Sequence, residues 1–314
     1  MADMKKIATR DSYGKALAQL GAEHPDLVVL DADLAGATKT ATFQKAFPDR
    51  HFDCGIAEGN MVTVAAGMAA AGLVPFASSF AMFAAGRAFE QIRNSIGYPH
   101  LNVKIGATHG GISVGEDGAS HQCCEDFALM RTIPGMVVIC PADDVEARAA
   151  VKAAYEHQGP VYLRFGRLAV PVFHEEDYEF RIGKGEVLKD GSDVAIIATG
   201  LMSYEALTAA GALEAEGISA RVINMPTIKP LDEALVLQAA KDCGRVITCE
   251  EHSVIGGLGE AVCSLLSEKL PTPVRRIGVN DEFGHSGPAG ALLKQFGLSA
   301  EHVAQVAREL CGKK

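Results

Sequence analysis

Two kinds of apolar pattern alternate along the first half of the chain. Short continuous apolar runs predict strands at 27–30, 74–77, 103–108, 136–139 and 161–164, and longer runs at helical spacing predict helices at 6–23, 41–47, 58–71, 84–96 and 142–157. A continuous apolar run is typical of a parallel strand that is buried on both faces. Strands that alternate with helices in this way indicate a parallel sheet covered by helices.

The pattern breaks around residues 171–184, where acidic and aromatic residues alternate from His174 to Glu179. The alternation then resumes, with strands predicted at 194–198, 220–224, 245–249 and 274–278 and helices at 203–216, 232–241, 257–269 and from about 299. The predicted fold class is therefore α/β with two domains, each a mostly parallel sheet with helices on both faces. The expected boundaries are 1–172 for the first domain, 173–185 for a linker and 186–314 for the second domain.

Composition narrows the possible partners. The chain of 314 residues is 48% hydrophobic and 22% charged, with a net charge of -10, which argues against nucleic acid and anionic membranes as partners. Residues 1–10 contain no apolar signal segment, so we expect a cytoplasmic location. Eight cysteines without metal-type spacing indicate free thiols in a reducing compartment.

One stretch has the length of a membrane span. No charged residue occurs from Gly59 to Gly86, which is long enough to cross a bilayer. Pro75 and the pair Ser78-Ser79 interrupt this run, and it is rich in alanine and glycine. We therefore expect a helix, a strand and a loop buried in protein, and no membrane span.

Candidate chemistry lies where the predicted strands end, because ligands of open parallel sheets bind beyond the carboxyl ends of the strands. Glu58 begins a helix, where the macrodipole alone accounts for an acid. Phe80 and Phe83 are predicted to lie in a loop. The segment 109–122 carries His109, His121 and four glycines, which let a backbone approach a ligand closely. Histidines there can bind metal, transfer protons or bind phosphate, although no His or Cys partner at metal-ligand spacing accompanies them.

Taken together, these residues resemble the carboxy-terminal part of transketolase, its pyrimidine-binding domain plus its C-terminal domain. The matching motifs are A-T-R at 8–10, D-A-D-L at 31–34, G-I-A-E at 55–58, S-F-A-M-F at 79–83, R-A-F-E-Q at 87–91, T-H at 108–109, V-G-E-D-G-A-S-H-Q at 114–122 and P-A-D at 141–143. The resemblance covers nearly the whole chain. It implies a transferase of aldehyde or ketone residues that depends on thiamine diphosphate and moves a two-carbon ketol unit from a ketose, expected to be a phosphate, to an aldose.

The resemblance also implies cofactor-binding residues. Glu58 matches the glutamate that hydrogen-bonds N1′ of the thiamine pyrimidine. A carboxyl group in an apolar place can share a proton with N1′, which favours the imino form of the 4′-amino group that then removes the C2 proton. Phe80 and Phe83 match aromatic residues that pack on the pyrimidine, and Asp33 matches a residue near the cofactor.

Substrate-binding residues follow from the same resemblance. His109 and His121 match substrate-facing histidines that act in catalysis with Glu58, and Asp117 matches the acid that binds a ketose hydroxyl. Arg10, His109 and Arg167 match the cluster that holds the sugar phosphate, in keeping with the preference of guanidinium for phosphate. The chain departs from the transketolase pattern at two positions. Ala37 stands where the family often has a serine of the phosphate pocket, and the aromatic residue expected shortly after Phe83 is missing near Gly86.

A further departure concerns the cofactor's diphosphate. Full transketolases carry an earlier domain whose Gly-Asp-Gly motif and downstream Asn bind Mg²⁺ and the diphosphate, and this chain has no such motif. The resemblance therefore implies a split enzyme, in which a separate subunit holds Mg²⁺ (or Ca²⁺) and the diphosphate and two copies of each subunit assemble. No metal ligand is expected in this chain itself.

Three alternatives remain open on the sequence. 1-Deoxyxylulose-5-phosphate synthase shares the G-E-D-G-x-[ST]-H-Q loop, and the beta subunit of 2-oxoacid dehydrogenases has the same two-domain plan. Thr108-His109 favours transketolase over the synthase, which has a different pair before that loop. The alternative from another class is a catalytically silent scaffold subunit, against which the intact Glu58, His109 and His121 argue. The segment Glu250-Glu251-His252 of the second domain is interpreted as structural.

Overall fold

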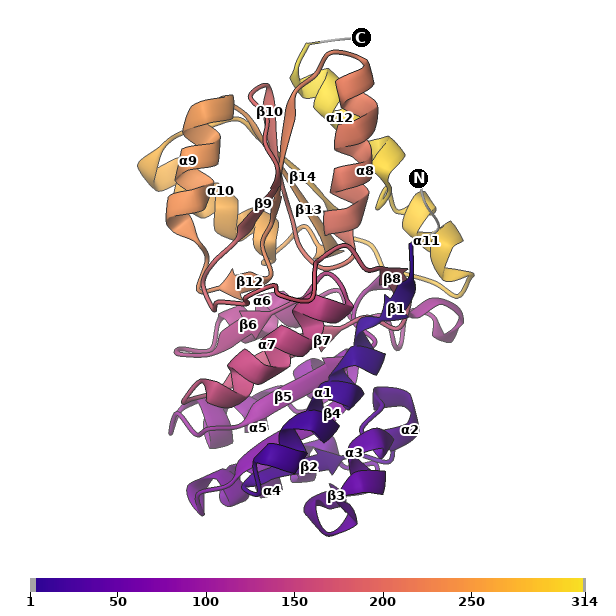
Figure 1. Cartoon of the computed structure of the whole chain (residues 1–314), viewed down its shortest axis with the longest axis vertical. Helices are drawn as coiled ribbons and strands as arrows, with labels where there is room; N and C mark the ends of the chain where they lie inside the picture. Colours follow the sequence, from indigo (N-terminus) through magenta and orange to yellow (C-terminus); the bar gives the residue numbers. More distant parts are fainter. Residues whose placement is uncertain (1–3, 313–314) are drawn as a thin grey trace.

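The apolar runs of the sequence form two separate sheets, one in each half of the chain, and the two α/β units stack end to end (Figure 1). The computed structural model describes residues 4–312. Residues 1–3 and 313–314, the outer ends of the two expected domains, lie outside the described residues. The predicted fold class, two mostly parallel α/β domains, is confirmed.

The first sheet has seven strands in the order β12-β6-β7-β5-β4-β2-β3. Their bounds are β2 Leu27–Asp31, β3 His51–Asp53, β4 Val74–Phe80, β5 Lys104–Thr108, β6 Val137–Ile139, β7 Val161–Phe165 and β12 Thr227–Lys229. All neighbours pair in parallel except β12, which runs antiparallel to β6. The carboxyl ends of β2, β4, β5 and β7 therefore meet at one edge.

Helices cover both faces of this sheet. On one face lie α1 Thr9–Glu23, α3 Ala41–Ala46 and α7 Asp144–Glu156; on the other lie α4 Glu58–Ala70, a helical stretch with π turns at Met82–Arg87 and Ile92–Gly97 around α5 Phe89–Gln91, and α6 Asp126–Arg131. Successive side chains of β2 point to opposite faces of the sheet. Leu27 and Val29 pack toward α1, while Val28 and Leu30 pack toward α4. Short segments complete the domain: α2 Ala35–Thr38, a 3₁₀ turn at Pro48–Arg50, and the two-stranded pair of β1 Lys6–Ala8 and β8 Ala169–Pro171.

The second sheet has five strands in the order β14-β13-β10-β11-β9. Their bounds are β9 Glu186–Lys189, β10 Val194–Ala198, β11 Ala220–Asn224, β13 Val246–Ser253 and β14 Val274–Val279. Helices α9 Glu233–Cys243 and α10 Leu258–Lys269 cover one face, and α8 Met202–Ala215 and α12 Ala300–Leu310 cover the other, with α11 Ala289–Gln295 beside the junction of the two domains. Only β9 pairs antiparallel within this sheet.

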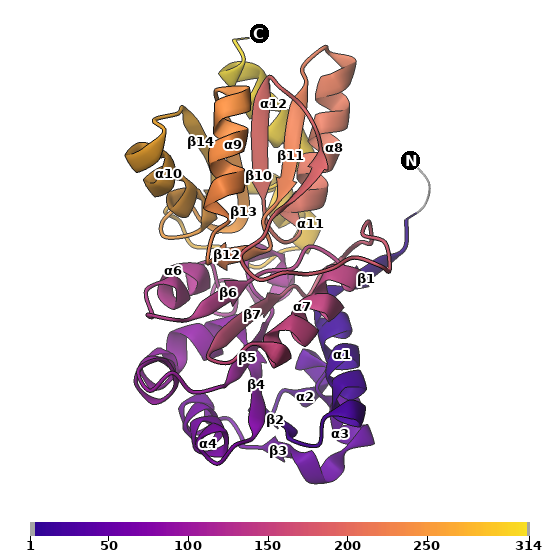
Figure 2. The same ribbon diagram turned by 60° about the vertical axis from the view of Figure 1, so that its left-hand side comes forward.

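The two domains share a hydrogen-bonded junction. Strand β12 follows the second domain's β11 in sequence but joins the first domain's sheet beside β6 (Figure 2). The Cys140 N–H also donates to the Pro226 carbonyl oxygen at 2.8 Å. One apolar cluster continues from the α4 face of the first sheet into the α9 and α10 face of the second. The division at 172 and 186 stays a prediction, and the structure adds that β12 crosses it.

Several local predictions were wrong or incomplete. The predicted helix 6–23 begins with strand β1, because Lys6–Ala8 pairs with Ala169–Pro171. The predicted strand 74–77 continues to Phe80, which pairs with Thr108 of β5, so Phe80 ends a strand and does not lie in a loop. Strands β3, β9 and β12 and helices α2, α6 and α11 are short and were not predicted; neighbouring strands and packing define them more than their own apolar pattern does.

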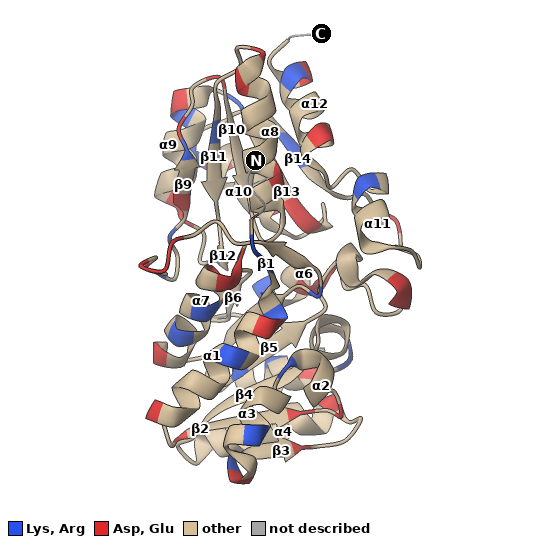
Figure 3. Ribbon diagram, turned by 45° about the vertical axis from the view of Figure 1, so that its right-hand side comes forward, with Lys and Arg blue, Asp and Glu red and all other residues tan. Residues whose placement is uncertain are grey.

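The uncharged stretch 59–86 is divided among α4, β4 and the following π turn. Among residues 4–312, no helix has both the length and the apolar character needed to cross a membrane. All eight cysteines are free, and five of them are buried. Figure 3 shows acidic and basic segments interspersed on the helices of both domains, and an acidic stretch in β13.

Candidate active site

Parallel pairing brings two aromatic rings together at the carboxyl edge of the first sheet. Phe80 is the last residue of β4 and pairs with Thr108, the last residue of β5. His109 follows directly, and its ring stacks on Phe80 with centroids 3.8 Å apart and planes 26° apart. His109 adopts a φ of 58°, a left-handed conformation that is uncommon for a residue other than glycine and that concentrates at functional sites.

Glu58 occupies the first position of α4 and is 1% exposed. Arg87 Nη1 donates to both carboxylate oxygens, at 3.0 Å to Oε1 and 2.8 Å to Oε2. Glu58 was expected in apolar surroundings, and the structure corrects this expectation. The π turn after β4 brings the Arg87 guanidinium against the Glu58 carboxylate. The Arg87 side chain is 52% exposed, so the pair opens to solvent on the arginine's side.

Phe83 connects this ion pair to the histidines. The Arg87 guanidinium carbon lies 4.5 Å from the Phe83 ring centroid, within cation–π distance. The rings of Phe83 and Phe80 stack with centroids 5.8 Å apart. The edge of His121 meets both, at 5.3 Å from Phe83 and 6.2 Å from Phe80. Six residues thus form one continuous chain of contacts from Glu58 to His109.

The hydrogen bonds of His109 fix its protonation. Arg10 Nη1 lies 2.9 Å from His109 Nε2, and a guanidinium can only donate, so Nε2 accepts. The proton then lies on Nδ1, which donates to Thr108 Oγ1 at 2.8 Å. Burial, and then the positive charges of Arg10 and Arg167, lower the pKa of His109 to about 3. His109 is consequently neutral near pH 7.

A group of cations surrounds this histidine. Arg10 donates to the Ala37 carbonyl at 3.2 Å, and its buried Nε has no hydrogen-bond partner within residues 4–312. Arg167 donates to the Val114 carbonyl and, at 3.1 Å, to Glu116 Oε2. The charges of Arg167 and Lys39 also contribute to the lowered pKa of His109. A buried guanidinium nitrogen without a partner, beside further cations, suits a bound anion.

Two predicted site residues stand apart from this chain of contacts. Asp33 and Asp117 are both exposed. The Asp33 N–H donates to Asp53 Oδ1 at 3.0 Å, and its φ is 59°. Asp117 ends the 3₁₀ segment Ile112–Asp117, four residues before His121. In the described part of the chain, neither side chain hydrogen-bonds or ion-pairs with another predicted site residue.

Arg87 and Lys39 belong to this candidate site but were not predicted from the sequence. Arg87 opens the R-A-F-E-Q motif at 87–91, which was the available signal, but nothing in the sequence showed that it faces Glu58 across 29 positions. Within residues 4–312, no group of three His, Cys, Asp or Glu side chains could hold a metal ion. The arrangement combines a buried carboxylate, a set of aromatic rings and a cluster of cations around His109.

Known proteins resemble this chain over both of its domains. Residues 5–172 match the family model of the transketolase pyrimidine binding domain, and residues 183–303 match that of the transketolase C-terminal domain. The chain is 52% identical over 299 residues to a transketolase C-terminal section of Methanocaldococcus jannaschii, covering 94% of each chain. It is 43% identical over 305 residues to a 6-deoxy-6-sulfo-D-fructose transketolase subunit of Clostridium sp. (strain MSTE9), covering 97% of this chain and 95% of that protein. A solved split-gene transketolase, an inactive beta4 tetramer, superposes with a TM-score of 0.90 at 54% identity, covering 99% of this chain and 100% of the other.

Proposed function

The chain belongs to the transketolase family, and we propose that it is the pyrimidine-binding subunit of a split, thiamine-diphosphate-dependent transketolase. The reaction would move a two-carbon ketol unit from an anionic ketose to an aldose. The observation that carries the proposal is the unbroken chain of contacts that runs from Glu58 to Arg10 through Arg87, Phe83, Phe80 and His109.

The residues present fit the pyrimidine half of the cofactor. A buried carboxylate that is linked through Arg87 to two stacked phenyl rings offers both a charged partner and an aromatic surface to a heteroaromatic ring with a protonatable nitrogen. When bound, thiamine diphosphate would supply the carbanion chemistry of ketol transfer. Glu58 would hold a proton at the pyrimidine N1′, and Phe80 and Phe83 would pack on the ring. Asp33 would lie near the same ring.

The remaining residues would bind and orient the ketose. His109, neutral and with its Nδ1 proton held by Thr108, and His121, on the edge of the phenyl pair, would face the reacting carbons in catalysis. Asp117 would bind a ketose hydroxyl. Arg10, His109 and Arg167 would hold the terminal anion, and the unpartnered Arg10 Nε supports this role.

The terminal anion is proposed to be a phosphate. The similarity to a subunit that acts on a sulfonated fructose gives a specific reason to test a sulfonate beside it. Ala37, where the family often has a serine, presents only its carbonyl oxygen to Arg10. Without that hydroxyl, the charges of Arg10 and Arg167 would be the main means by which the chain recognises the terminal anion.

A second chain would complete the site. We expect a diphosphate-binding subunit that holds Mg²⁺ or Ca²⁺, two copies of each chain in the assembly, and a cytoplasmic location. The similarity to a split-gene transketolase that was solved as an inactive beta4 tetramer supports a chain that is inactive alone.

Reconstitution tests this function. The purified chain with thiamine diphosphate and Mg²⁺ is expected to show no ketol transfer, and transfer is expected when the diphosphate-binding subunit is added. Robust transfer by the chain alone would refute the need for a partner. Condensation of pyruvate with an aldose phosphate, without ketol transfer, would instead establish the synthase alternative.

A further inference from the structure

Two glycines of the substrate loop, residues 109–122, face the second domain. A Cβ atom on Gly111, which has a φ of 81°, would lie only 2.3 Å from the Glu251 carboxyl carbon. A Cβ on Gly118, with a φ of 74°, would lie 2.5 Å from Ser286 Oγ. At these two positions the missing side chain admits another domain, and the expectation that the glycines admit a ligand is corrected there.

Glu251 makes the first direct contact with the loop. Its carboxylate Oε1 accepts from the Ser113 N–H at 2.6 Å, and the residue is 5% exposed. Burial raises the pKa of Glu251. Arg164 of β7 links the loop side to the second domain at the same position. Its Nη2 donates to the carbonyl oxygens of Glu251 at 2.8 Å and Cys123 at 3.0 Å.

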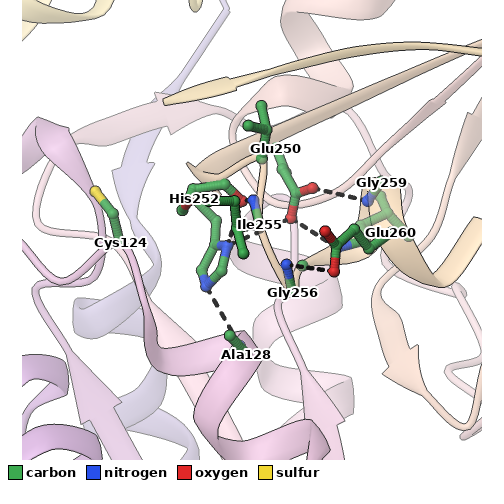
Figure 4. A network of polar contacts seen from close by, with 12 residues as sticks. Cys124, Ala128, Glu250, His252, Ile255, Gly256, Gly259 and Glu260 are labelled. Atoms are coloured by element: carbon green, nitrogen blue, oxygen red, sulfur yellow. Dashed lines mark hydrogen bonds and ion pairs between the residues drawn. The ribbon is translucent and has the colours of Figure 1, made fainter. Parts of the chain in front are cut away.

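The neighbouring residues hold Glu251 in place within its own domain. Figure 4 shows Glu250 pointing to the start of α10, where its two carboxylate oxygens accept from the N–H groups of Leu258 and Gly259, both at 2.7 Å. His252 Nε2 lies 3.4 Å from the Ala128 N–H of α6. The carboxyl end of β13 is thus fixed to its own helix and to the first domain.

Gln122 makes the second contact from the far end of the loop. Its Nε2 donates to the His285 carbonyl oxygen of the second domain at 3.0 Å. The same amide lies 3.2 Å from the Ile112 carbonyl and 3.3 Å from the Gly115 carbonyl, so it closes the loop on itself. The loop 109–122 is therefore hydrogen-bonded to the second domain at two places, Ser113 and Gln122.

We propose that the second domain sets the conformation of the substrate loop, with Glu251 and the segment 284–287 positioning His121 and Asp117 for the ketose. The substrate role of the loop rests on the proposed function. The inference extends that function by making the second domain part of substrate selection. Glu251 is a positioning residue, since it acts through Ser113 and Gly111 and not on the substrate.

A matched pair of glycine substitutions tests the kinetic consequence. In Gly284→Ala the new Cβ would lie 2.0 Å from Gln122 Oε1 and 2.8 Å from Ile112 Cδ1, whereas Gly290→Ala adds the same methyl group with nothing within 4 Å. In the reconstituted enzyme we expect Gly284→Ala to lower kcat/KM for the ketose about tenfold, mainly through KM, because a displaced loop binds substrate in poorer geometry. Gly290→Ala should match wild type. Equal effects of the two variants would overturn the inference.

Hydrogen–deuterium exchange of the isolated chain tests the contact without any activity. Glu251→Ala should speed exchange of the Ser113 amide about tenfold, and Glu251→Gln should not, because the amide oxygen still accepts the hydrogen bond. Unchanged protection in Glu251→Ala, or equal loss in both variants, would contradict the positioning role. If wild type shows no ketol transfer after reconstitution, the proposed function fails while this exchange result still decides the contact. If Glu251→Ala does not fold, the glycine pair decides.

Discussion

Polar residues lie at the carboxyl edges of both sheets, but their hydrogen-bond partners differ between the two edges. At the edge of the first sheet, Arg87 and Arg167 are half-exposed or nearly so, and Arg10 keeps a buried nitrogen without a partner in the described structure. At the edge of the second, Glu250 and Glu251 are buried and accept from backbone N–H groups. Topology gathers polar residues at such edges. We propose that this difference in hydrogen-bond partners separates a candidate binding site at the first edge from a pair of structural glutamates at the second, Glu250 and Glu251, which we call the brace.

Removal of the first sheet's carboxylate is expected to have the largest effect. Glu58→Ala should lower kcat of the reconstituted enzyme about 10³-fold, the range of a lost proton-transfer group, and leave the fold intact because Arg87 can be solvated. The exposed Glu156 is a matched control for the same change, and its replacement should leave kcat unaltered. Turnover and circular dichroism on both variants check this. Full activity of Glu58→Ala would remove Glu58 from the proposed mechanism.

Loss of Arg167, one of the cations around His109, is expected to weaken substrate binding. Arg167→Ala should raise KM about tenfold or more for an anionic ketose and change KM little for an uncharged one, because a hydrogen bond to a charged group is lost. Arg308, which pairs with Glu216 at 2.7 Å on the far side of the second domain, supplies the control substitution. An equal rise in KM for both ketoses would exclude an anion-binding role.

A glutamate-to-alanine substitution at Glu250, in the second domain, is expected to lower stability. Glu250→Ala removes the acceptor of two N–H groups at the start of α10 and should lower the free energy of unfolding by about 2 kcal/mol. Glu260→Ala, at a half-buried glutamate of the same helix turn, should cost less than about 1 kcal/mol. Urea denaturation measures both. Equal losses would mean that burial of the carboxylate is not the deciding factor.

Acid is expected to weaken the first domain through His109. Its folded pKa of about 3 lies below the unfolded value of about 6.5, so the unfolded chain alone binds a proton between these values. Stability should therefore fall as pH decreases from about 6.5 toward 3, by at most about 1.4 kcal/mol per pH unit. His109→Asn should show a shallower fall in stability over the same pH range. Parallel stability curves for wild type and His109→Asn would contradict this.

The sequence predicted most of the framework. Continuous apolar runs gave the central strands of both sheets, and Glu58 begins α4 as expected, because a strand buried on both faces and a helix start leave local signals. Phe80 was placed in a loop, since the extension of β4 depends on pairing with β5. Strand β12 has three residues, too few for a pattern, and its pairing across the domains is tertiary.

The candidate site was predicted less fully than the framework. The motifs supplied its residues, but the Arg87 ion pair with Glu58 depends on the π turn after β4. Glu250 and Glu251 are adjacent and chemically identical in the sequence. Alternation along a strand sends them to opposite sides, one to α10 and one to the substrate loop. The interpretation of this segment as structural did not include its contact with the loop, because only the packing of the two domains creates it.

One measurement tests the separation of site and brace most directly. Glu58→Gln and Glu250→Gln make the same isosteric change at two buried glutamates, one at each edge, and kcat of both is compared in the reconstituted enzyme at a temperature where both are folded. We expect Glu58→Gln to abolish ketol transfer and Glu250→Gln to retain a kcat close to that of wild type. Retained turnover in Glu58→Gln, or an equal loss in both variants, would contradict it.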